Sequence, residues 1–542
     1  MPLSRHIQPE DVLAASRDHP HRKHTDRHER HVLEQSWTRD EDAASAPKYT
    51  FPARGIPSKA AYQLLHDEAA LDGNPTLNLA SFVHTWMPDE GVRLFNEAID
   101  KNLADQDEYP AAQIIHNRCV SMLAHLWKAP TADTTAVGTA TAGSSEAIML
   151  AGLALKKRWQ DARKRAGKDH YHPNIVFGAN AQVALEKFAR YWDVEARMVP
   201  VNRETSYVLK PEDAIQYIDE NTIGVMVILG STYNGAFEDV GRMSSLLDDL
   251  QERTGLDIPI HVDAASGGFI APFAYPEYKW AFDVSRVVSI NSSGHKFGLV
   301  YPGLGWLIFR DESCLHKDLV FELHYLGSVE YSYTLNFSKP AAPVFAQMFN
   351  FLNLGYNGYA KIAFKDLRNA RMLARALERT YFTVLSEIHR PAPDAPAGVD
   401  EEDPQFYVKG LPVVTFRLSD EYKQKYPHVK QAWIQTSLRT KGWIVPNYNA
   451  PKGEEQTEML RVVVRESMTE DLIERLIVDI LQIVEAFMDD SDGTQMMIAY
   501  TGGSGPHQPD MEHSRPKAAN FGGADEKADE SVVPQAGYSR QC

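Results

Sequence analysis

The pair His295-Lys296 follows a turn of small residues that leaves the apolar run 287–290. Small side chains let the backbone approach a bulky ligand closely, and a lysine held near apolar walls can lose its proton. An unprotonated lysine amine is a nucleophile that bonds to aldehydes. The pair therefore indicates covalent amine chemistry, although an exposed loop lysine would give the same short pattern.

A carboxylate, Asp263, ends a second apolar run at 258–263 and is followed by Ala265 and by two glycines. Open α/β sheets bind their ligands at the carboxyl ends of such strands. A carboxylate placed there can keep a ring nitrogen protonated, and a small residue beside it leaves room for a flat ring. An aspartate that only caps a helix or a turn is the simpler alternative.

A glycine and two serines, Gly143, Ser144 and Ser145, come directly before the helical run 147–159. The free N–H groups and the dipole at a helix N-terminus attract phosphate, and serine hydroxyls can donate to it as well. The same residues with Glu146 could instead form a capping box that binds nothing. The segment lacks the lysine and the glycine spacing of nucleoside-triphosphate loops.

These three features lie in order along one stretch of the chain. They would supply a phosphate seat, a carboxylate for a ring nitrogen and a lysine for an aldehyde. Pyridoxal 5′-phosphate needs all three contacts at once. The sequence therefore predicts this cofactor, and it predicts no metal ion.

The elements that would position these residues alternate between apolar runs and helical stretches. Strands are predicted at 174–178, 197–201, 223–230 and 258–263, and helices at 181–192, 211–219 and 242–253. This alternation predicts an α/β domain with a mainly parallel sheet, because strands buried on both faces are apolar throughout. Beyond it, helices at 365–381, 429–440 and 470–488 and strands at 411–418 and 460–465 predict a small α+β domain.

The two ends of the chain differ in composition from the part between them. Residues 1–56 are predicted to form a partly disordered N-terminal arm, and the Gly/Pro-rich segment 493–542 a disordered tail. The arm contains a histidine-rich run at 19–31. This run is interpreted as a solvated arm, with a metal site and a pH-responsive helix as alternatives.

The overall composition excludes several classes of protein. Of the 542 residues, 43% are hydrophobic and 24% charged, which is typical of a soluble globular protein. The net charge of −17 gives no support for nucleic acid binding. The three cysteines, Cys119, Cys314 and Cys542, show no metal-ligand spacing and favour a reducing compartment, so we predict a cytoplasmic protein. Residues 1–26 lack an apolar signal segment and the run 223–229 is too short to span a bilayer, so no membrane association is predicted.

Four strings in the chain resemble the pyridoxal-phosphate-dependent glutamate decarboxylases of the group II decarboxylase family. They cover residues 142–147, 187–195, 261–272 and 293–298. The resemblance extends from about Pro57 to Met488. It implies a fold type I, aminotransferase-like large domain at 57–366 and a small C-terminal domain at 367–492.

The resemblance also implies a role for each cofactor residue. Lys296 would bond to the aldehyde, Asp263 would pair with the ring nitrogen, Ala265 would lie under the ring and Gln182 would stack on its other face. The contacts to the phosphate and to the ring hydroxyl would come from Ser144, Ser145, Ser293, His295 and Thr232. His295 and Lys296, with Asp263, are therefore the predicted catalytic residues.

The substrate contacts follow from the same resemblance. Arg461 would bind the α-carboxylate of the substrate. Ser81 and Phe82, with Asn102 and Asp105 contributed across a dimer interface, would surround its distal carboxylate. The family more often has threonine at position 81, and the hydroxyl is retained here. Asp105 can approach a substrate carboxylate only if one of the two groups is protonated.

The implied activity is α-decarboxylation of L-glutamate to 4-aminobutyrate (GABA) and carbon dioxide by a homodimer or a higher homo-oligomer. A decarboxylase of aspartate, cysteine sulfinate or an aromatic amino acid is an alternative, and Gln182, Ser81 and Asp105 disfavour the aromatic substrate. A non-catalytic homologue that acts as an interaction protein is another. Calmodulin is not a predicted partner, because no tryptophan follows Trp443 and the tail is acidic.

Overall fold

The computed structural model describes residues 32–34, 45–130, 136–323, 330–395 and 398–488. The predicted tail and most of the predicted arm, including its histidine-rich run, lie outside these residues. The chain divides into two compact units, Met1–Asn74 and Pro75–Cys542. The described part of the first unit contains the antiparallel pair β1 (Val32–Glu34) and β2 (Ser45–Pro47) and the helix α2 (Ser58–Ala69).

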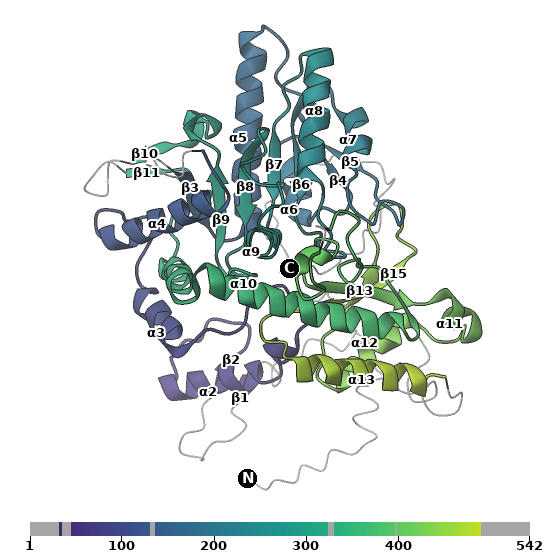
Figure 1. Cartoon of the computed structure of the whole chain (residues 1–542). Coiled ribbons are helices and arrows are strands. Elements are labelled where there is room, and N and C mark those ends of the chain that lie inside the picture. The colour runs from purple at the N-terminus through teal and green to yellow at the C-terminus, as the bar shows by residue number, and fades with distance from the viewer. Residues whose placement is uncertain (1–31, 35–44, 131–135, 324–329, 396–397, 489–542) are drawn as a thin grey trace, which may run out of the picture. The chain divides into compact units, whose positions relative to one another are not determined.

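A seven-stranded sheet forms the centre of the second unit, in the order β3-β9-β8-β7-β6-β4-β5 (Figure 1). Its strands are β3 (Val137–Thr141), β4 (Asn174–Gly178), β5 (Glu195–Val199), β6 (Thr222–Ile228), β7 (Ile260–Asp263), β8 (Val287–Ser292) and β9 (Gly305–Phe309). The strands from β8 to β5 are parallel, and β9 runs antiparallel to both of its neighbours. The mainly parallel sheet that the sequence predicts is confirmed.

Both faces of this sheet are buried. Along β4, Ile175 and Phe177 pack into one hydrophobic cluster while Val176 packs into another. Alternate residues of a strand point to opposite faces, so the two clusters lie on the two sides of the sheet. The helices of this part of the chain are α3 (Asp89–Ala98), α4 (Pro110–Leu126), α5 (Ser144–Arg165), α6 (Val183–Tyr191), α7 (Pro211–Ala214), α8 (Val240–Thr254) and α9 (Ala271–Ala274).

A four-stranded antiparallel sheet follows along the chain, in the order β12-β13-β15-β14. It contains β12 (Phe382–Val384), β13 (Val413–Leu418), β14 (Asn447–Asn449) and β15 (Glu458–Val463), with the helices α11 (Asp420–Lys425), α12 (Gln431–Thr440) and α13 (Glu470–Ala486). A hairpin of β10 (Phe321–Leu323) and β11 (Glu330–Ser332) precedes them. The small α+β region is thus present as predicted.

One long helix, α10 (Ala342–Glu378), connects the two sheets and bends at Gly355, where φ is +57°. It contacts α3 and α4 on one side and β12, β13 and α13 on the other (Figure 1). The predicted domain boundary at residues 366 and 367 falls inside this helix, so the division into domains stays a prediction. No described helix is both long and apolar enough to cross a bilayer.

The sequence predictions missed parts of these elements. The helix α10 begins at Ala342 rather than near residue 365, because the kink at Gly355 interrupts its periodicity. The strands β3 and β9 were not predicted, since they form an antiparallel pair outside the regular alternation of strands and helices. Predicted ends elsewhere differ from the observed ends by a few residues.

A buried glutamate, Glu238, joins the carboxyl ends of two central strands. Its Oε1 accepts hydrogen bonds from Asn180 Nδ2, 2.9 Å away, and from the Leu209 N–H at 3.1 Å. Its Oε2 accepts the N–H of Ile228, the last residue of β6, at 2.6 Å. Burial raises the pKa of Glu238 to about 7, although the three donors oppose the shift.

This raised pKa predicts a specific pH dependence of stability. Because the folded pKa lies above the ordinary value of 4.5, folding takes up a proton at Glu238 between these values. Its contribution is present in full below about pH 4.5 and is lost as the pH rises through about 7. We expect the stability advantage of the wild type over Glu238→Gln to fall by about 2 kcal/mol between pH 5 and pH 8.

Urea unfolding at both pH values measures this difference. The exposed Glu387 supplies the matched control, since Glu387→Gln should show no such pH-dependent difference. A Glu238→Gln variant whose stability relative to the wild type is the same at both pH values would contradict the prediction.

Candidate active site

The N-terminus of α5 and the turn after β8 meet at a pair of serine hydroxyls. Ser144 is the first residue of α5, and its Oγ lies 2.7 Å from the Oγ of Ser293. A Cβ added to Gly143 would lie 3.2 Å from Cε1 of His295. Ser145 is exposed beside this pair. The structure therefore brings Ser144, Ser293 and His295 together at the end of a long helix, as a phosphate seat requires.

Close backbone packing shapes the same place. Gly305 in β9 is paired with Thr141 in β3, two residues before Gly143. A Cβ on Gly305 would lie 2.4 Å from the carbonyl carbon of Gly143. No side chain fits in that gap, so a glycine is needed at position 305 to hold the turn in place.

Lys296 lies against an aromatic wall. Its Nζ donates to Ser266 Oγ over 3.4 Å and lies 5.3 Å from the ring centre of Phe82. The guanidinium of Arg461 lies 5.1 Å from the centre of the same ring. The structure thus places the predicted lysine, arginine and phenylalanine side by side, although they come from distant parts of the chain.

Asp263 ends β7 and is buried, with 4% of its surface exposed. Its Oδ1 accepts the N–H of Ala265 at 3.1 Å and the side-chain amide of Asn291 at 2.9 Å. The Ala265 carbonyl in turn accepts the N–H of Ser293, which links this turn to the phosphate seat. These contacts fix the aspartate and the alanine at the same edge of the sheet.

His295 is electrically neutral in this environment. Burial, with the neighbouring charge of Lys296, lowers the pKa of His295 to about 4. Its Nδ1 accepts the N–H of Leu304 at 3.3 Å, and its carbonyl accepts the N–H of His84 at 2.9 Å. A neutral ring with Nδ1 accepting carries its proton on Nε2, which is then available as a donor.

Arg461, in β15, is buried and points back to the large sheet. Its two terminal nitrogens each donate over 2.6 Å, one to the carbonyl of Thr232 and the other to that of Ala80. Its Nε is buried and has no hydrogen-bond partner among the described residues. The Nε of Arg465 has the same status, so it is the position of Arg461 next to Phe82 and Lys296 that makes Arg461 the candidate for an anionic ligand.

A second arginine, Arg465, holds the segment that carries Ser81 and Phe82. Its guanidinium donates to the carbonyls of Pro75 and Asn78, at 3.0 and 2.9 Å, and to that of Val83. Ser81 Oγ accepts the N–H of Val83 at 3.1 Å, which closes a turn around Phe82. Burial lowers the pKa of Arg465 to about 10, so it stays charged at neutral pH.

Three predicted residues are less directly connected to this cluster. Gln182 caps α6 by accepting the N–H of Ala184 at 2.7 Å, and its contact with a ring stays a prediction. Asn102 donates to Asp105 over 3.1 Å and accepts the N–H of Lys339 at the same distance. Neither Asn102 nor Asp105 has a described hydrogen bond to Lys296 or Arg461, so their contact with the substrate stays a prediction.

Sequence reasoning missed several residues that shape the site. Ser266, Asn291, His261 and Arg465 contact or hold the predicted ones. The alternation of Ser289 and Asn291 in an otherwise apolar strand was a usable signal, since buried polar residues need partners. Arg465 gave no comparable signal, because its partners are backbone carbonyls far away in the sequence.

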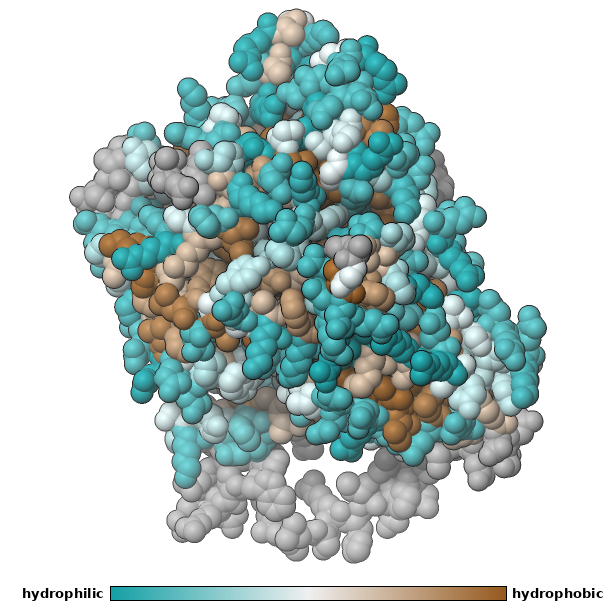
Figure 2. Space-filling model, viewed as in Figure 1, coloured by the Kyte–Doolittle hydropathy of each residue, from teal (hydrophilic) through white to brown (hydrophobic). Residues whose placement is uncertain are grey.

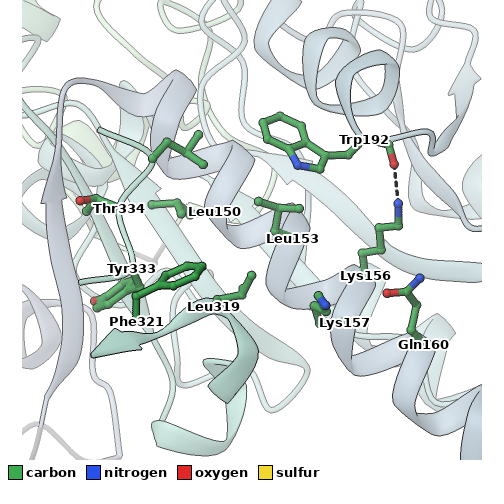
Figure 3. Close-up of a pocket in the computed structure, with 11 residues that line it drawn as sticks. Leu150, Leu153, Lys156, Lys157, Gln160, Trp192, Leu319, Phe321, Tyr333 and Thr334 are labelled. Atoms are coloured by element: carbon green, nitrogen blue, oxygen red, sulfur yellow. Dashed lines mark hydrogen bonds between the residues drawn. The ribbon is translucent and has the colours of Figure 1, made fainter. Parts of the chain in front are cut away.

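A separate cavity of about 470 Å³ contains none of the predicted site residues (Figure 3). Leu150, Leu153 and Lys156 of α5 line it, with Trp192 on one side and Phe321 and Tyr333 on the other. Lys156 donates to the Trp192 carbonyl at its rim. The cavity therefore does not belong to the candidate active site.

The residues around Lys296 fit pyridoxal 5′-phosphate. The hydroxyl pair at the N-terminus of α5 suits the phosphate, and the hydroxyl of Ser292 nearby in the chain is buried without a partner among the described residues. Both side-chain hydrogen bonds of Asp263 go to Oδ1, which leaves Oδ2 for a ring nitrogen. The fold and this donor set define a pyridoxal-phosphate-dependent enzyme.

Comparison with known proteins gives the family. Residues 52–392 match the model of the pyridoxal-dependent decarboxylase conserved domain, and the chain belongs to that family. It is 47% identical to a glutamate decarboxylase of Saccharomyces cerevisiae, over 81% of this chain and 79% of the relative. It is 48% identical to that of Petunia hybrida, over 81% and 83%.

A solved structure gives the same result. The glutamate decarboxylase of Lactobacillus brevis is similar, with a TM-score of 0.75 and 37% identity, over 82% of this chain and 96% of the other. The predicted cofactor and the predicted fold type I architecture are thereby confirmed.

Replacement of Lys296 tests its predicted bond to the cofactor. Lys296→Ala should abolish the visible absorption of the pyridoxal-phosphate-loaded protein and reduce turnover by on the order of a thousandfold or more, because the covalent anchor is lost. Absorption spectra, and peptide mapping after borohydride reduction, measure this. The exposed Lys452 is the control, and Lys452→Ala should keep both properties. A label on a different lysine would refute the assignment.

Proposed function

We propose that the protein catalyses the α-decarboxylation of L-glutamate to 4-aminobutyrate and carbon dioxide. The observation that supports this most directly is that Lys296 and the buried Arg461 both lie against the ring of Phe82, at 5.3 and 5.1 Å from its centre. Arg461 offers a place for the α-carboxylate beside the lysine that would anchor the cofactor. The identity of 41 to 48% to curated glutamate decarboxylases supports glutamate as the substrate.

The proposed roles on the cofactor side rest on the family resemblance, and the contacts around Asp263 and Ser293 support them. Bound pyridoxal 5′-phosphate would accept the electron pair that remains when carbon dioxide leaves. Ser144, Ser145, Ser293 and His295 would hold the phosphate, Thr232 the ring hydroxyl, and Ala265 and Gln182 the two faces of the ring. Asp263 would keep the ring nitrogen protonated through Oδ2.

On the substrate side, Arg461 would orient the carboxylate that leaves. The ring of Phe82 covers both Lys296 and Arg461, so it would exclude water from the bond that breaks. A proton then replaces carbon dioxide at Cα, and the net reaction consumes one proton. Ser81 lies beside Phe82 in the segment that Arg465 holds, where it would face the distal part of the substrate.

A second copy of the chain is proposed to complete the site. Asn102 and Asp105 lie in the segment between α3 and α4 and have no described hydrogen bond to Lys296 or Arg461. Apolar residues flank this loop, since Ile99, Ile114 and Leu352 are 51%, 52% and 72% exposed. Brown side chains gather on the side of the molecule where α3 and α4 lie (Figure 2). Exposed apolar surface of this kind marks interaction sites and supports a homodimer or a larger assembly.

Co-expression of two inactive variants tests the shared site. Lys296→Ala lacks the anchor, and Asp105→Ala lacks the group that would come from the other subunit. In a mixed dimer one of the two sites is intact, so random assembly should restore about a quarter of the wild-type activity. No recovery above the separately expressed variants, or full activity of Asp105→Ala alone, would contradict the shared site.

Other amino acids remain rival substrates on the same scaffold. Carbon dioxide release from purified, cofactor-loaded protein should be at least about a hundredfold faster, in kcat/KM, with L-glutamate than with aspartate, cysteine sulfinate or aromatic amino acids. Aromatic amino acids lack a distal carboxylate for the proposed contacts. Aspartate and cysteine sulfinate carry a distal acid group on a side chain one carbon shorter, so that group would not reach the same contacts. Equal or faster turnover of another amino acid would replace the proposed substrate. A colourless protein that borohydride cannot label would favour the non-catalytic alternative.

We also propose that the protein acts in a reducing compartment, the cytoplasm. Cys119 and Cys314 are both free thiols in the structure. Cys119 is buried, and burial raises the pKa of its thiol to about 12, which keeps it unreactive.

A further inference from the structure

A chain of buried polar side chains reaches Asp263 from inside the sheet. His261 lies between Ser289 and Asn291, with its Nδ1 2.7 Å from Ser289 Oγ and its Nε2 2.7 Å from Asn291 Oδ1. Asn291 Nδ2 then reaches Asp263 Oδ1 at 2.9 Å. Of these four side chains, none is more than 4% exposed. The register explains the contacts, because His261 pairs with Ser289 and Asp263 with Asn291 across β7 and β8.

The chemistry of the four groups fixes the direction of every hydrogen bond. The carboxylate of Asp263 can only accept, so Asn291 donates its amide and presents its carbonyl oxygen to His261. His261 must therefore carry its proton on Nε2, and its bare Nδ1 accepts the hydroxyl proton of Ser289. Burial lowers the pKa of His261 to about 4, which agrees with a ring that carries one proton.

We propose that His261 acts through Asn291 as a positioning residue for the cofactor. It fixes the amide of Asn291 so that an N–H holds Oδ1 of Asp263, and Oδ2 then faces the ring nitrogen. This proposal rests on the role of Asp263 in the proposed function. It gives a purpose to a buried histidine whose two ring nitrogens are both engaged inside the sheet.

The alternative orientation of Asn291 shows why the histidine is needed. If the amide turned over, its carbonyl oxygen would face the Asp263 carboxylate, and two acceptors would oppose each other without a proton. The N–H of Ala265, 3.1 Å away, would then be the donor that remains for Oδ1 among the described residues. The aspartate would lose the hydrogen bond that orients its Oδ2 toward the ring nitrogen.

The dissociation constant of pyridoxal 5′-phosphate, measured on cofactor-depleted protein, tests the proposal without any amino acid substrate. His261→Phe and Asn291→Leu should each raise it about 10- to 100-fold, as expected for a lost hydrogen bond to a charged group. The double variant should have a dissociation constant no higher than that of either single variant, because both substitutions break the same series of hydrogen bonds. The kcat of the loaded enzyme should fall while the KM for its substrate changes little.

Conservative variants separate positioning from packing. His261→Gln has a donor and an acceptor and should recover most of the cofactor affinity. Ser289→Ala removes the hydroxyl that donates to Nδ1 of His261 and leaves the contact with Asn291 in place. It should therefore raise the dissociation constant by only a few fold. Ile290→Val removes buried volume from the same strand but replaces none of the hydrogen-bonded side chains. It should therefore leave the dissociation constant unchanged.

Additive effects of His261→Phe and Asn291→Leu would overturn the proposal, as would wild-type cofactor affinity in a folded Asn291→Leu variant. If His261→Phe does not fold, the cofactor dissociation constants of His261→Gln, Ser289→Ala and Asn291→Leu still test whether the hydrogen bonds position Asp263. Failure of the proposed substrate is a distinct result, because cofactor affinity is measured in the absence of any amino acid.

Discussion

Burial of both faces of the seven-stranded sheet is the constraint on which the rest of the structure depends. A strand covered on both sides can carry few polar groups along its length, and most of those present are used within the sheet. The strand ends are the main place left for ionisable side chains. Asp263, Ser293 and the Ser231-Thr232 turn all follow central strands there, and Glu238 ties the neighbouring ends together.

The smaller sheet contributes positively charged side chains to the candidate active site. Arg461 and Arg465 extend from β15 and the residues after it, and both bind backbone carbonyls of the segment that contains Ser81 and Phe82. Carbonyl groups accept hydrogen bonds from most of the N–H donors of each guanidinium without neutralising its charge. The charge therefore remains available to an anion, even though the protein as a whole is strongly acidic.

The sequence predicted the features of this arrangement that depend on residues close together in the chain. The parallel strands, the helix after Gly143 and the positions of Asp263 and Lys296 all follow from short patterns, because each depends on periodicity or on one turn. The resemblance to a family supplied Arg461, Gln182 and Asp105, which no local pattern distinguished from surface residues. The partners of Asp263 and Arg461 could not be predicted, since they depend on register between strands and on carbonyls distant in sequence.

The contact between Gly143 and Gly305 has a consequence for how such a protein can be altered by engineering. The residues proposed around the distal carboxylate lie on loops and can change one at a time, so a new substrate is reachable by stepwise selection. The two backbones at the phosphate seat approach so closely that even one added carbon has no space. Libraries aimed at new chemistry on this scaffold should therefore leave the codon for Gly305 untouched and place their diversity in the loops.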